Sequence, residues 1–370
     1  MTAANPIYVE IFPLLVPKLT GIGRFSARLV QSLNRLAPLR LTTFLDPRTQ
    51  RVHELNQDLA RGQEIALEIG AAGDSQDDVA EWVRQLCARP KQPYDDAAAG
   101  RHAGIYTWSR PAERRFGREI GIFYDFTPLI VPWSHTTGLR DGFNRQVMAS
   151  RHCAKMLAIS HSTKADAAWL SPVPEDDIAV AYPGPSQCLT RHAHSEPVER
   201  RKNAMLIVGT REPRKNGDFL LDWFLNTSVL PEDFELWWAG PSGWLWDGPQ
   251  GFAGHPRQEQ VKFLGMVSDA RLCELYQQAT FTVYPSLYEG FGFPVLDSLL
   301  HGAPVLSSYN SSLAELEGPG VFYFDPCDAG SLDQAYLQMA AASPVLIDTA
   351  PLYKRFCWDA LASVVAGLAA

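Results

Sequence analysis

Residues 281–302 constrain the fold of this chain more than any other stretch. They read as a short apolar strand over 281–284, a loop with two glycines, and a helix that starts near Pro294 and stops at Gly302. Proline suits the first helical turn, where its missing N–H would have no partner, and glycine suits a helix end. A strand that leads through a short loop into a helix is the repeating unit of an α/β fold with a parallel sheet.

The loop and helix of this stretch carry two carboxylates eight positions apart. We expect Glu289 in the loop at the carboxyl end of the strand, and Asp297 about one turn into the helix. Between them, Gly290 and Gly292 let the main chain approach a ligand closely. The N–H groups of residues 291–295, Pro294 excepted, are predicted to point out of the helix start, which favours an anion there. A phosphate at the helix start, with hydroxyl-binding carboxylates on either side, suits a nucleotide sugar.

Strands and helices alternate through the chain in two series. The first opens with a strand over 7–16 and a helix over 25–36. Their Gly-x-Gly connection is only a fragment of the dinucleotide-binding fingerprint, so a tight turn without a ligand is the alternative. The second series opens with a strand over 204–208. Each series predicts a parallel, doubly wound, Rossmann-like sheet, giving two α/β domains that face one another across a cleft. Further strands are expected over 120–126, 155–160, 235–239 and 261–264, and helices over 218–225, 269–279 and 354–368.

The length of the chain points to two domains. A chain of 370 residues is too long for one ordinary core. The polar, proline-bearing stretch 183–203 is the clearest linker candidate. We therefore place the boundary between a domain over 1–183 and a domain over 184–352, followed by a final segment over 353–370.

Composition excludes several classes of protein. No window approaches the roughly 18 unbroken apolar residues of a membrane span, and the first residues lack the basic and apolar regions of a secretory signal. The net charge is −8 and no basic stripe is interleaved with aromatics, so we expect no nucleic-acid partner. The six cysteines are scattered without metal-ligand spacing, and we expect buried, reduced thiols in a cytoplasmic protein.

The densest basic cluster comprises Arg110, Arg114, Arg115 and Arg118. Such a cluster is able to contact anionic lipid headgroups, and the alternative is a solvated face of the protein. On the first interpretation the protein would lie peripherally at the inner membrane face.

Other strand ends carry candidate functional residues. Tyr124 and Asp125 end an apolar strand and are placed to line a cleft between domains. The local pattern fits equally well a tyrosine packed in the core and an aspartate that caps the loop. Arg211, Arg214 and Lys215 lie within five positions after the strand that opens the second series, which suits a pyrophosphate. Here the alternative is a surface loop with solvated charges.

Several motifs follow one another in a fixed order along the chain. In the second half they are VGTREPRKN at 208–216, FLGMVSD at 263–269, the stretch 284–297 and GAPVL at 302–306; in the first half they lie at 21–25, 124–129 and 158–163. Together these motifs resemble the retaining glycosyltransferases of family 4, which have the GT-B fold. Their order and spacing hold over residues 204–330, and the N-terminal half agrees more loosely.

The resemblance assigns roles to matching residues. Glu289 and Asp297 occupy the two carboxylates of the family's E-x7-E motif, of which the first binds hydroxyls of the donor sugar and supports its reacting face, and the second holds the ribose. Lys215, helped by Arg211 or Arg214, would hold the diphosphate. Further ligand contacts are implied for Gly23 in the N-terminal loop and for the N–H groups around Phe291, Gly292 and Phe293.

Two positions depart from the family's pattern. Asp297 stands in place of the second glutamate and is one methylene shorter, which puts the ribose contact in question. Tyr124 stands where the family often has histidine before Asp125. A tyrosine hydroxyl can donate a hydrogen bond to a sugar, but it stays neutral near pH 7 and cannot perform a role that needs an imidazole.

The resemblance implies a retaining hexosyltransferase with an acceptor-side domain over 1–183 and a donor-binding domain over 184–352. The segment 353–370 would cross back to the first domain. The donor would be a GDP- or UDP-linked sugar, with mannose as the hexose, and the acceptor a glycan or a lipid-linked glycan. No DxD metal motif stands out, so lysine and arginine are expected in place of a metal ion, with no cofactor. Alternatives are a non-catalytic GT-B subunit that binds sugar nucleotides, and an epimerase or phosphorylase on the same fold.

Overall fold

The computed structural model describes residues 5–14, 21–43, 53–54, 92–93, 95–186, 202–243, 252–342 and 344–370. The linker candidate at 183–203 therefore lies largely outside the described residues. Contacts within the chain form two compact units. Unit 1 comprises Met1–Phe126, Asp141–Gly184 and Phe356–Ala370, and unit 2 comprises Thr127–Arg140 and Pro185–Arg355.

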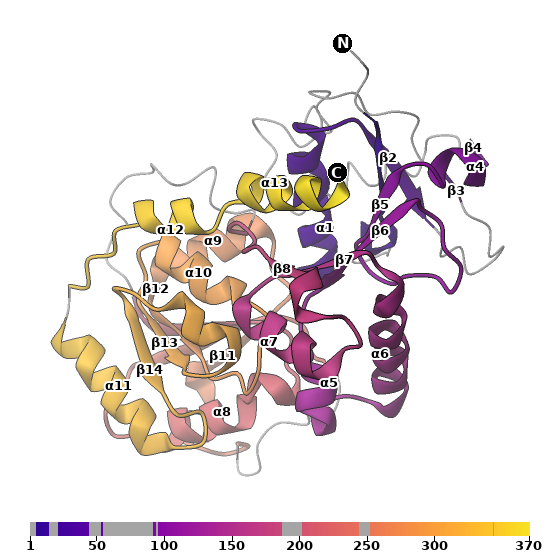
Figure 1. The fold of residues 1–370 in the computed structure, drawn as a ribbon. Helices are drawn as coiled ribbons and strands as arrows, with labels where there is room; N and C mark the ends of the chain where they lie inside the picture. Colours follow the sequence, from indigo (N-terminus) through magenta and orange to yellow (C-terminus); the bar gives the residue numbers. More distant parts are fainter. Residues whose placement is uncertain are drawn as a thin grey trace. The chain divides into compact units, whose positions relative to one another are not determined.

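The described strands of unit 1 form one sheet, in the order β4-β3-β2-β1-β5-β6-β7-β8 (Figure 1). Neighbours from β2 to β8 are parallel, whereas the two-residue strands β3 and β4 pair antiparallel at one edge. The order runs outward in both directions from β1 and β5, as in a doubly wound sheet. The strands are β1 (Ile7–Glu10), β2 (Leu39–Thr43), β3 (His53–Glu54), β4 (Gln92–Pro93), β5 (Ala103–Tyr106), β6 (Arg118–Phe123), β7 (Lys155–Ala158) and β8 (Ile178–Val180).

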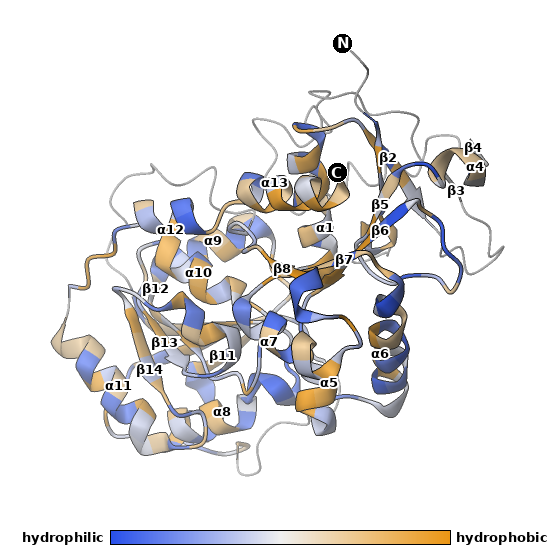
Figure 2. Ribbon diagram, in the orientation of Figure 1, coloured by the Kyte–Doolittle hydropathy of each residue, from blue (hydrophilic) through white to orange (hydrophobic). Residues whose placement is uncertain are grey.

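The long first helix of unit 1 packs along the last helix of the chain, α13 (Figure 1). The Phe25 and Trp358 rings meet edge to face with centroids 5.2 Å apart. Figure 2 colours α13 mainly as hydrophobic, in keeping with this buried face. The α-helices between β1 and β8, together with the last one, are α1 (Gly21–Asn34), α4 (Asp96–Ala99), α5 (Thr127–Ile130), α6 (Thr137–Ala149), α7 (His161–Leu170) and α13 (Trp358–Ala369); the 3₁₀ helices are η1 (Phe12–Leu14), η2 (Pro132–Ser134), η3 (Ser150–His152) and η4 (Glu175–Asp177).

The described strands of unit 2 form a second sheet, in the order β11-β10-β9-β12-β13-β14. All of its neighbouring strands are parallel, and the order reverses between β9 and β12. The strands are β9 (Lys202–Val208), β10 (Glu235–Ala239), β11 (Val261–Gly265), β12 (Ala279–Tyr284), β13 (Val305–Ser308) and β14 (Val321–Phe324). The helices are η6 (Pro213–Lys215), α8 (Gly217–Asn226), η7 (Gln258–Gln260), α9 (Asp269–Gln278), α10 (Phe293–Leu300), η8 (Ser311–Leu316), α11 (Ala329–Ala341) and α12 (Ala350–Arg355).

Strand β9 shows why the second sheet is covered on both faces. Met205 and Ile207 join the core shared with α8 and α11, whereas Ala204 and Leu206 join the core shared with α9. Alternate side chains of a strand point to opposite faces, so a strand that is apolar at consecutive positions must be buried on both. The predicted strands and helices of the second series, from β9 to α10, are therefore confirmed within a few residues.

Three predicted elements were wrong in extent. The helix predicted over 25–36 spans Gly21–Asn34. The strand predicted over 7–16 ends at Glu10, and η1 follows it. The helix predicted over 354–368 is two helices, α12 and α13, because Phe356 is buried against Tyr182 in unit 1 and Cys357 has extended backbone angles. Periodicity alone does not reveal such a break, since apolar residues continue through it.

The basic cluster at 110–118 is neither a uniformly solvated face nor a free cationic patch. The Arg110 side chain is 6% exposed and pairs with Glu119 at 2.7 Å. Arg114 donates to the carbonyl oxygen of Phe116, and Arg118 donates to that of Leu368 in α13. These arginines hold a loop and a helix end in place through intramolecular bonds.

The cysteines differ in exposure and in bonding. Cys153, Cys327 and Cys357 are free thiols, but Cys327 is exposed. Cys273 is disulfide-bonded, so the expectation of buried, reduced thiols was wrong for Cys327 and Cys273.

None of the helices in the described part of the chain combines the length and apolar character needed to cross a bilayer.

Candidate functional site

The main candidate site lies where the strand order of the second sheet reverses. The loop that carries Lys215 follows β9, and the loop that carries Glu289 follows the neighbouring strand β12. Both strands are parallel, so their carboxyl ends meet at one edge of the sheet. The edge at which the strand order reverses is where open α/β sheets bind ligands. Lys215 and Glu289 are far apart in the sequence, and the pairing of β9 with β12 brings them close together.

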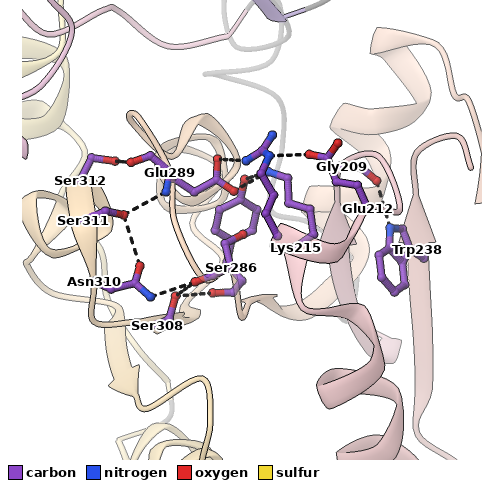
Figure 3. Close-up of polar contacts among 12 residues, drawn as sticks. Gly209, Glu212, Lys215, Trp238, Ser286, Glu289, Ser308, Asn310, Ser311 and Ser312 are labelled. Carbon is purple, nitrogen blue, oxygen red and sulfur yellow. Dashed lines mark hydrogen bonds and ion pairs between the residues drawn. The ribbon is translucent and has the colours of Figure 1, made fainter. Parts of the chain in front are cut away.

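Four charged or polar side chains form a buried network at this edge (Figure 3). The Lys215 Nζ atom donates to Glu289 Oε1 at 2.6 Å and to the Tyr284 hydroxyl at 2.5 Å. Arg214 Nη1 donates to the other carboxylate oxygen, Glu289 Oε2, at 2.7 Å. Glu289 thus receives one cation on each oxygen, which is the charge-assisted geometry that binds a carboxylate most firmly.

This network keeps Glu289 ionised. Burial by itself would raise the pKa of the Glu289 carboxyl, but the positive charges of Arg214 and Lys215 outweigh it and lower the pKa to about 2. Burial lowers the pKa of the Lys215 ammonium, and the charge of Glu289 opposes that shift. Burial and the Glu289 charge both raise the pKa of Tyr284, so its hydroxyl stays protonated.

The main chain of Glu289 is held by two consecutive serines of η8. The Glu289 N–H donates to Ser311 Oγ at 3.0 Å, and Ser312 Oγ donates to the Glu289 carbonyl oxygen at 2.9 Å. Ser311 has a φ of 44°, in the left-handed region that non-glycine residues rarely adopt. Figure 3 shows these serines on one side of Glu289 and Lys215 on the other. Backbone strain at such a contact is a common mark of a functional site.

A second set of bonds fixes the start of the same loop. The carbonyl oxygen of Ser286 accepts from Ser308 Oγ at 2.7 Å and from Asn310 Nδ2 at 3.0 Å. The Leu287 N–H donates to the Arg214 carbonyl oxygen at 2.8 Å. The loops that follow β9, β12 and β13 therefore hold one another in register around the network.

The helix start beside Glu289 is partly as predicted. Gly292 precedes α10 with a φ of 108°, and a Cβ atom there would lie 2.7 Å from Leu313 of η8, so only glycine fits. Gly290 and Phe291 are buried, and Phe291 packs edge to face on Phe293. The predicted outward direction was wrong for Val295, whose N–H donates to the Gly292 carbonyl oxygen at 3.0 Å, because it already lies within the helical bonding pattern.

The second motif carboxylate, Asp297, lies inside α10 and is 3% exposed. Its Oδ1 accepts a hydrogen bond from the Ser186 N–H at 3.0 Å. Ser186 belongs to the segment that enters unit 2, so this carboxylate anchors that segment to α10.

Arg211 takes a different position from Arg214. Its guanidinium donates to the Ser242 hydroxyl and lies 4.8 Å from the centre of the Phe263 ring. Arg211 therefore lies toward the ends of β10 and β11, whereas Arg214 contacts Glu289. Among the described residues no group of three or more His, Cys, Asp or Glu side chains is arranged to hold a metal ion.

The predicted site residues of the first series belong to unit 1. Gly23 lies in the first turn of α1, and not in a loop before it, because α1 begins at Gly21. Tyr124 directly follows β6 and is partly buried; its hydroxyl donates to the Thr107 carbonyl oxygen at 2.8 Å, and burial raises its pKa. Asp125 beside it is partly buried as well.

Glu212, Tyr284, Ser311 and Ser312 were missed by sequence reasoning. Glu212 is 3% exposed and pairs with Arg214 Nε at 2.6 Å. Glu212 and Tyr284 lie in the quoted motifs, next to residues that were selected. The serines had no such signal, because their role depends on a contact with Glu289 more than 20 positions away.

Comparison with known proteins finds relatives over this part of the chain and over most of its length. A family model described as "Glycosyl transferases group 1" matches residues 202–342, a stretch that contains Lys215, Glu289 and both serines of η8. Among curated proteins, O-antigen chain mannosyltransferase B of Escherichia coli is 28% identical over 364 residues, covering 88% of each chain. O-antigen chain mannosyltransferase RfbU of Salmonella typhimurium is 27% identical over 191 residues, 51% of each chain.

Solved structures of other proteins share the fold of this chain over nearly its whole length. The crystal structure of Anabaena Alr3699/HepE in complex with UDP superposes with a TM-score of 0.58 at 14% identity, covering 98% of both chains. At this identity the likeness concerns the fold alone.

Proposed function

The chain is a group 1 glycosyltransferase of the GT-B fold that uses a nucleotide sugar, and on that premise we propose that it transfers a hexose with retention of configuration. The observation that carries the proposal is Glu289, held ionised by Lys215 and Arg214 beside the start of α10. A buried carboxylate with two cations at a sheet switch point suits a sugar diphosphate, whose sugar presents hydroxyl donors and whose phosphates present negative charge.

The charges of the network match those that develop when a glycosyl phosphate bond breaks. Negative charge grows on the departing diphosphate, where Lys215 and Arg214 would stabilise it together with the helix start at Phe291, Gly292 and Phe293. Positive charge grows on the sugar ring, where the Glu289 carboxylate would stabilise it. These cations would supply the positive charge at the diphosphate, which supports transfer without a metal ion.

The other predicted contacts complete the proposed donor and acceptor sites. We assign Asp297 to the ribose and Arg211 to the nucleotide part of the donor. Gly23, Tyr124 and Asp125 are assigned to the sugar or acceptor side. Tyr124 has donated its only O–H to Thr107, so its oxygen would accept from a sugar hydroxyl and would not donate.

The names of the curated relatives bear on the substrates. Both are O-antigen chain mannosyltransferases, which supports mannose from a GDP donor and a growing glycan, lipid-linked, as the acceptor. A UDP-linked donor is the second candidate, supported by the solved neighbour that holds UDP. We place the reaction in the cytoplasm at the inner membrane face, where such acceptors would be met.

A thermal-shift panel of GDP-, UDP-, dTDP- and ADP-sugars without added metal tests the donor site. A ligand at 100 times its Kd adds about 2.7 kcal/mol to native-state stability, which corresponds to several degrees at roughly 2–4 °C per kcal/mol. We expect a clear shift with one base, lost in Lys215→Ala because the diphosphate loses its buried cation. No shift with any donor, from folded wild-type protein, would contradict the assignment.

A non-catalytic subunit that binds sugar nucleotides is the second candidate. The observation that favours it concerns the two residues that differ from the family's pattern. Both are hydrogen-bonded within the chain, Tyr124 to Thr107 and Asp297 to Ser186. Release of free nucleoside diphosphate that depends on a glycan acceptor would exclude it. Donor binding without any release or transfer would favour it.

A further inference from the structure

Arg214 is shared between two carboxylates, and only one of them belongs to the motif pair. Its Nε lies 2.6 Å from Glu212 Oε1, and its Nη1 lies 2.7 Å from Glu289 Oε2. Glu212 is 3% exposed and precedes η6, the single turn that carries Arg214 and Lys215. A guanidinium bonded on two edges by buried carboxylates has a fixed orientation, because each bond restricts the other.

The second carboxylate changes the charge that a diphosphate would meet. Glu212 and Glu289 together carry two negative charges, and Arg214 and Lys215 carry two positive charges, so these four groups sum to zero. Without Glu212 the same groups would sum to +1. Coulomb interactions between unit charges a few ångströms apart are much stronger near or inside a protein than in water, so one buried charge is enough to alter nucleotide affinity strongly.

We propose that Glu212 is a positioning residue that holds Arg214 toward Glu289 and limits how strongly the cluster binds the leaving nucleoside diphosphate. This inference rests on the proposed function of the same site. The Glu212 carboxylate keeps the Arg214 guanidinium in the orientation that contacts Glu289, and it cancels part of the positive charge of Arg214. The product nucleotide is therefore bound by directed hydrogen bonds and not by an excess of positive charge, which allows it to leave after transfer.

The test is the affinity of the full-length protein for GDP and UDP, measured by calorimetry in wild type and in Glu212→Gln. The glutamine keeps the size and the acceptor oxygen for Arg214 Nε but removes the charge. We expect the nucleotide that the wild type binds to bind roughly fivefold or more tightly to the variant, because the cluster gains one positive charge. The gain should shrink as salt is raised, and inhibition by this product should strengthen by the same factor while turnover falls.

Matched variants separate positioning from simple structural support. Glu274→Gln changes the net charge equally at an exposed carboxylate of α9 that pairs with Arg271, and should leave nucleotide affinity within about twofold. Glu212→Asp keeps the charge and should bind nucleotide nearly as wild type does. In Glu212→Gln combined with Arg214→Gln the gain should vanish, because Arg214 is the group that Glu212 controls.

The outcomes are distinct. Weaker or unchanged nucleotide binding by folded Glu212→Gln overturns the inference, since a residue that merely supports the loop weakens the site when it is altered. A steep salt dependence of nucleotide binding by the wild type also overturns it, and this measurement needs no variant at position 212. Wild-type protein that binds neither nucleotide, and no other diphosphate in the donor panel, overturns the proposed function itself.

Discussion

Two buried glutamates at strand ends, Glu10 in unit 1 and Glu289 in unit 2, have opposite electrostatic environments. Glu10 ends β1 with no exposed surface; its Oε1 accepts from the Phe12 N–H at 2.7 Å, and its Oε2 has no hydrogen-bond partner among the residues that the structure describes. Burial raises the pKa of Glu10 to about 8, and the bond from Phe12 offsets only part of this. In Glu289 two cations reverse the effect of burial and lower the pKa to about 2. Burial alone therefore does not mark a charged site; the buried counter-charges do.

Replacement of each glutamate by glutamine should separate these environments most sharply. Glu289→Gln leaves Lys215 and Arg214 buried without their shared counter-charge, so we expect turnover to fall at least tenfold, which corresponds to about 1.4 kcal/mol of barrier. Breaking a buried pair also costs about 3 kcal/mol of stability. Glu10→Gln imitates the protonated form that already prevails at pH 7, so its turnover should stay close to wild type. The measurement is kcat of both variants at a temperature where circular dichroism shows them folded.

Equal activity of the two variants would remove the basis of the comparison. Wild-type turnover by Glu289→Gln would also remove Glu289 from the proposed site. A large loss in Glu10→Gln would show that the unit 1 carboxyl has a charged role that its environment does not reveal.

The pH dependence of stability should run in opposite directions for the two residues. The pKa of Glu10 is raised in the folded state, so between pH 4.5 and about 8 the unfolded chain releases a proton that the folded chain keeps. The contribution of Glu10 is thus fully present below pH 4.5 and is lost as pH rises toward 8, at about 1.4 kcal/mol per pH unit. Glu289, with its lowered pKa, contributes stability above pH 4.5 that is lost as pH falls toward 2.

Urea unfolding at intervals from pH 5 to pH 8 checks the first of these slopes. Glu10→Gln should flatten the decline of unfolding free energy across that window, because glutamine does not titrate. Glu289→Gln should leave the slope unchanged, because the Glu289 carboxyl is ionised in both the folded and the unfolded chain over this pH range. A slope that Glu10→Gln does not alter would mean that another group causes it.

The smallest expected effect concerns the serine that holds the Glu289 main chain. Ser311→Ala removes the acceptor of the Glu289 N–H, at a cost of about 1 kcal/mol, and should lower turnover severalfold. Ser311→Gly removes the same hydroxyl but relieves the left-handed φ of 44°, so it should be more stable than Ser311→Ala by about 0.5–1 kcal/mol. Melting temperatures and kcat of both variants test this, and an alanine variant at least as stable as glycine would mean that the φ stores no strain.

Much of the fold of unit 2 could be predicted because its signals are local. Pro294 and Gly302 mark the ends of α10, and the apolar runs of β9 and β12 mark strands buried on both faces. The sequence placed Lys215 and Glu289 each after a strand, but it did not show that β9 and β12 are neighbours in the sheet. What remained unpredicted depends on distant partners. Nothing near Ser311 in sequence shows that it receives the Glu289 N–H, and nothing near Arg110 shows that it lies buried against Glu119.

The packing of α13 on α1 has a consequence for the order in which the units are completed during synthesis. Unit 2 ends at Arg355, while unit 1 still lacks Phe356–Ala370. A growing chain that has passed Arg355 has therefore translated all described strands of the second sheet, but Phe25 and Gly184 still lack the Trp358 ring that covers them. The first unit to be started therefore needs residues that are translated after all of unit 2, because its apolar surface is covered only once Phe356–Ala370 have been made.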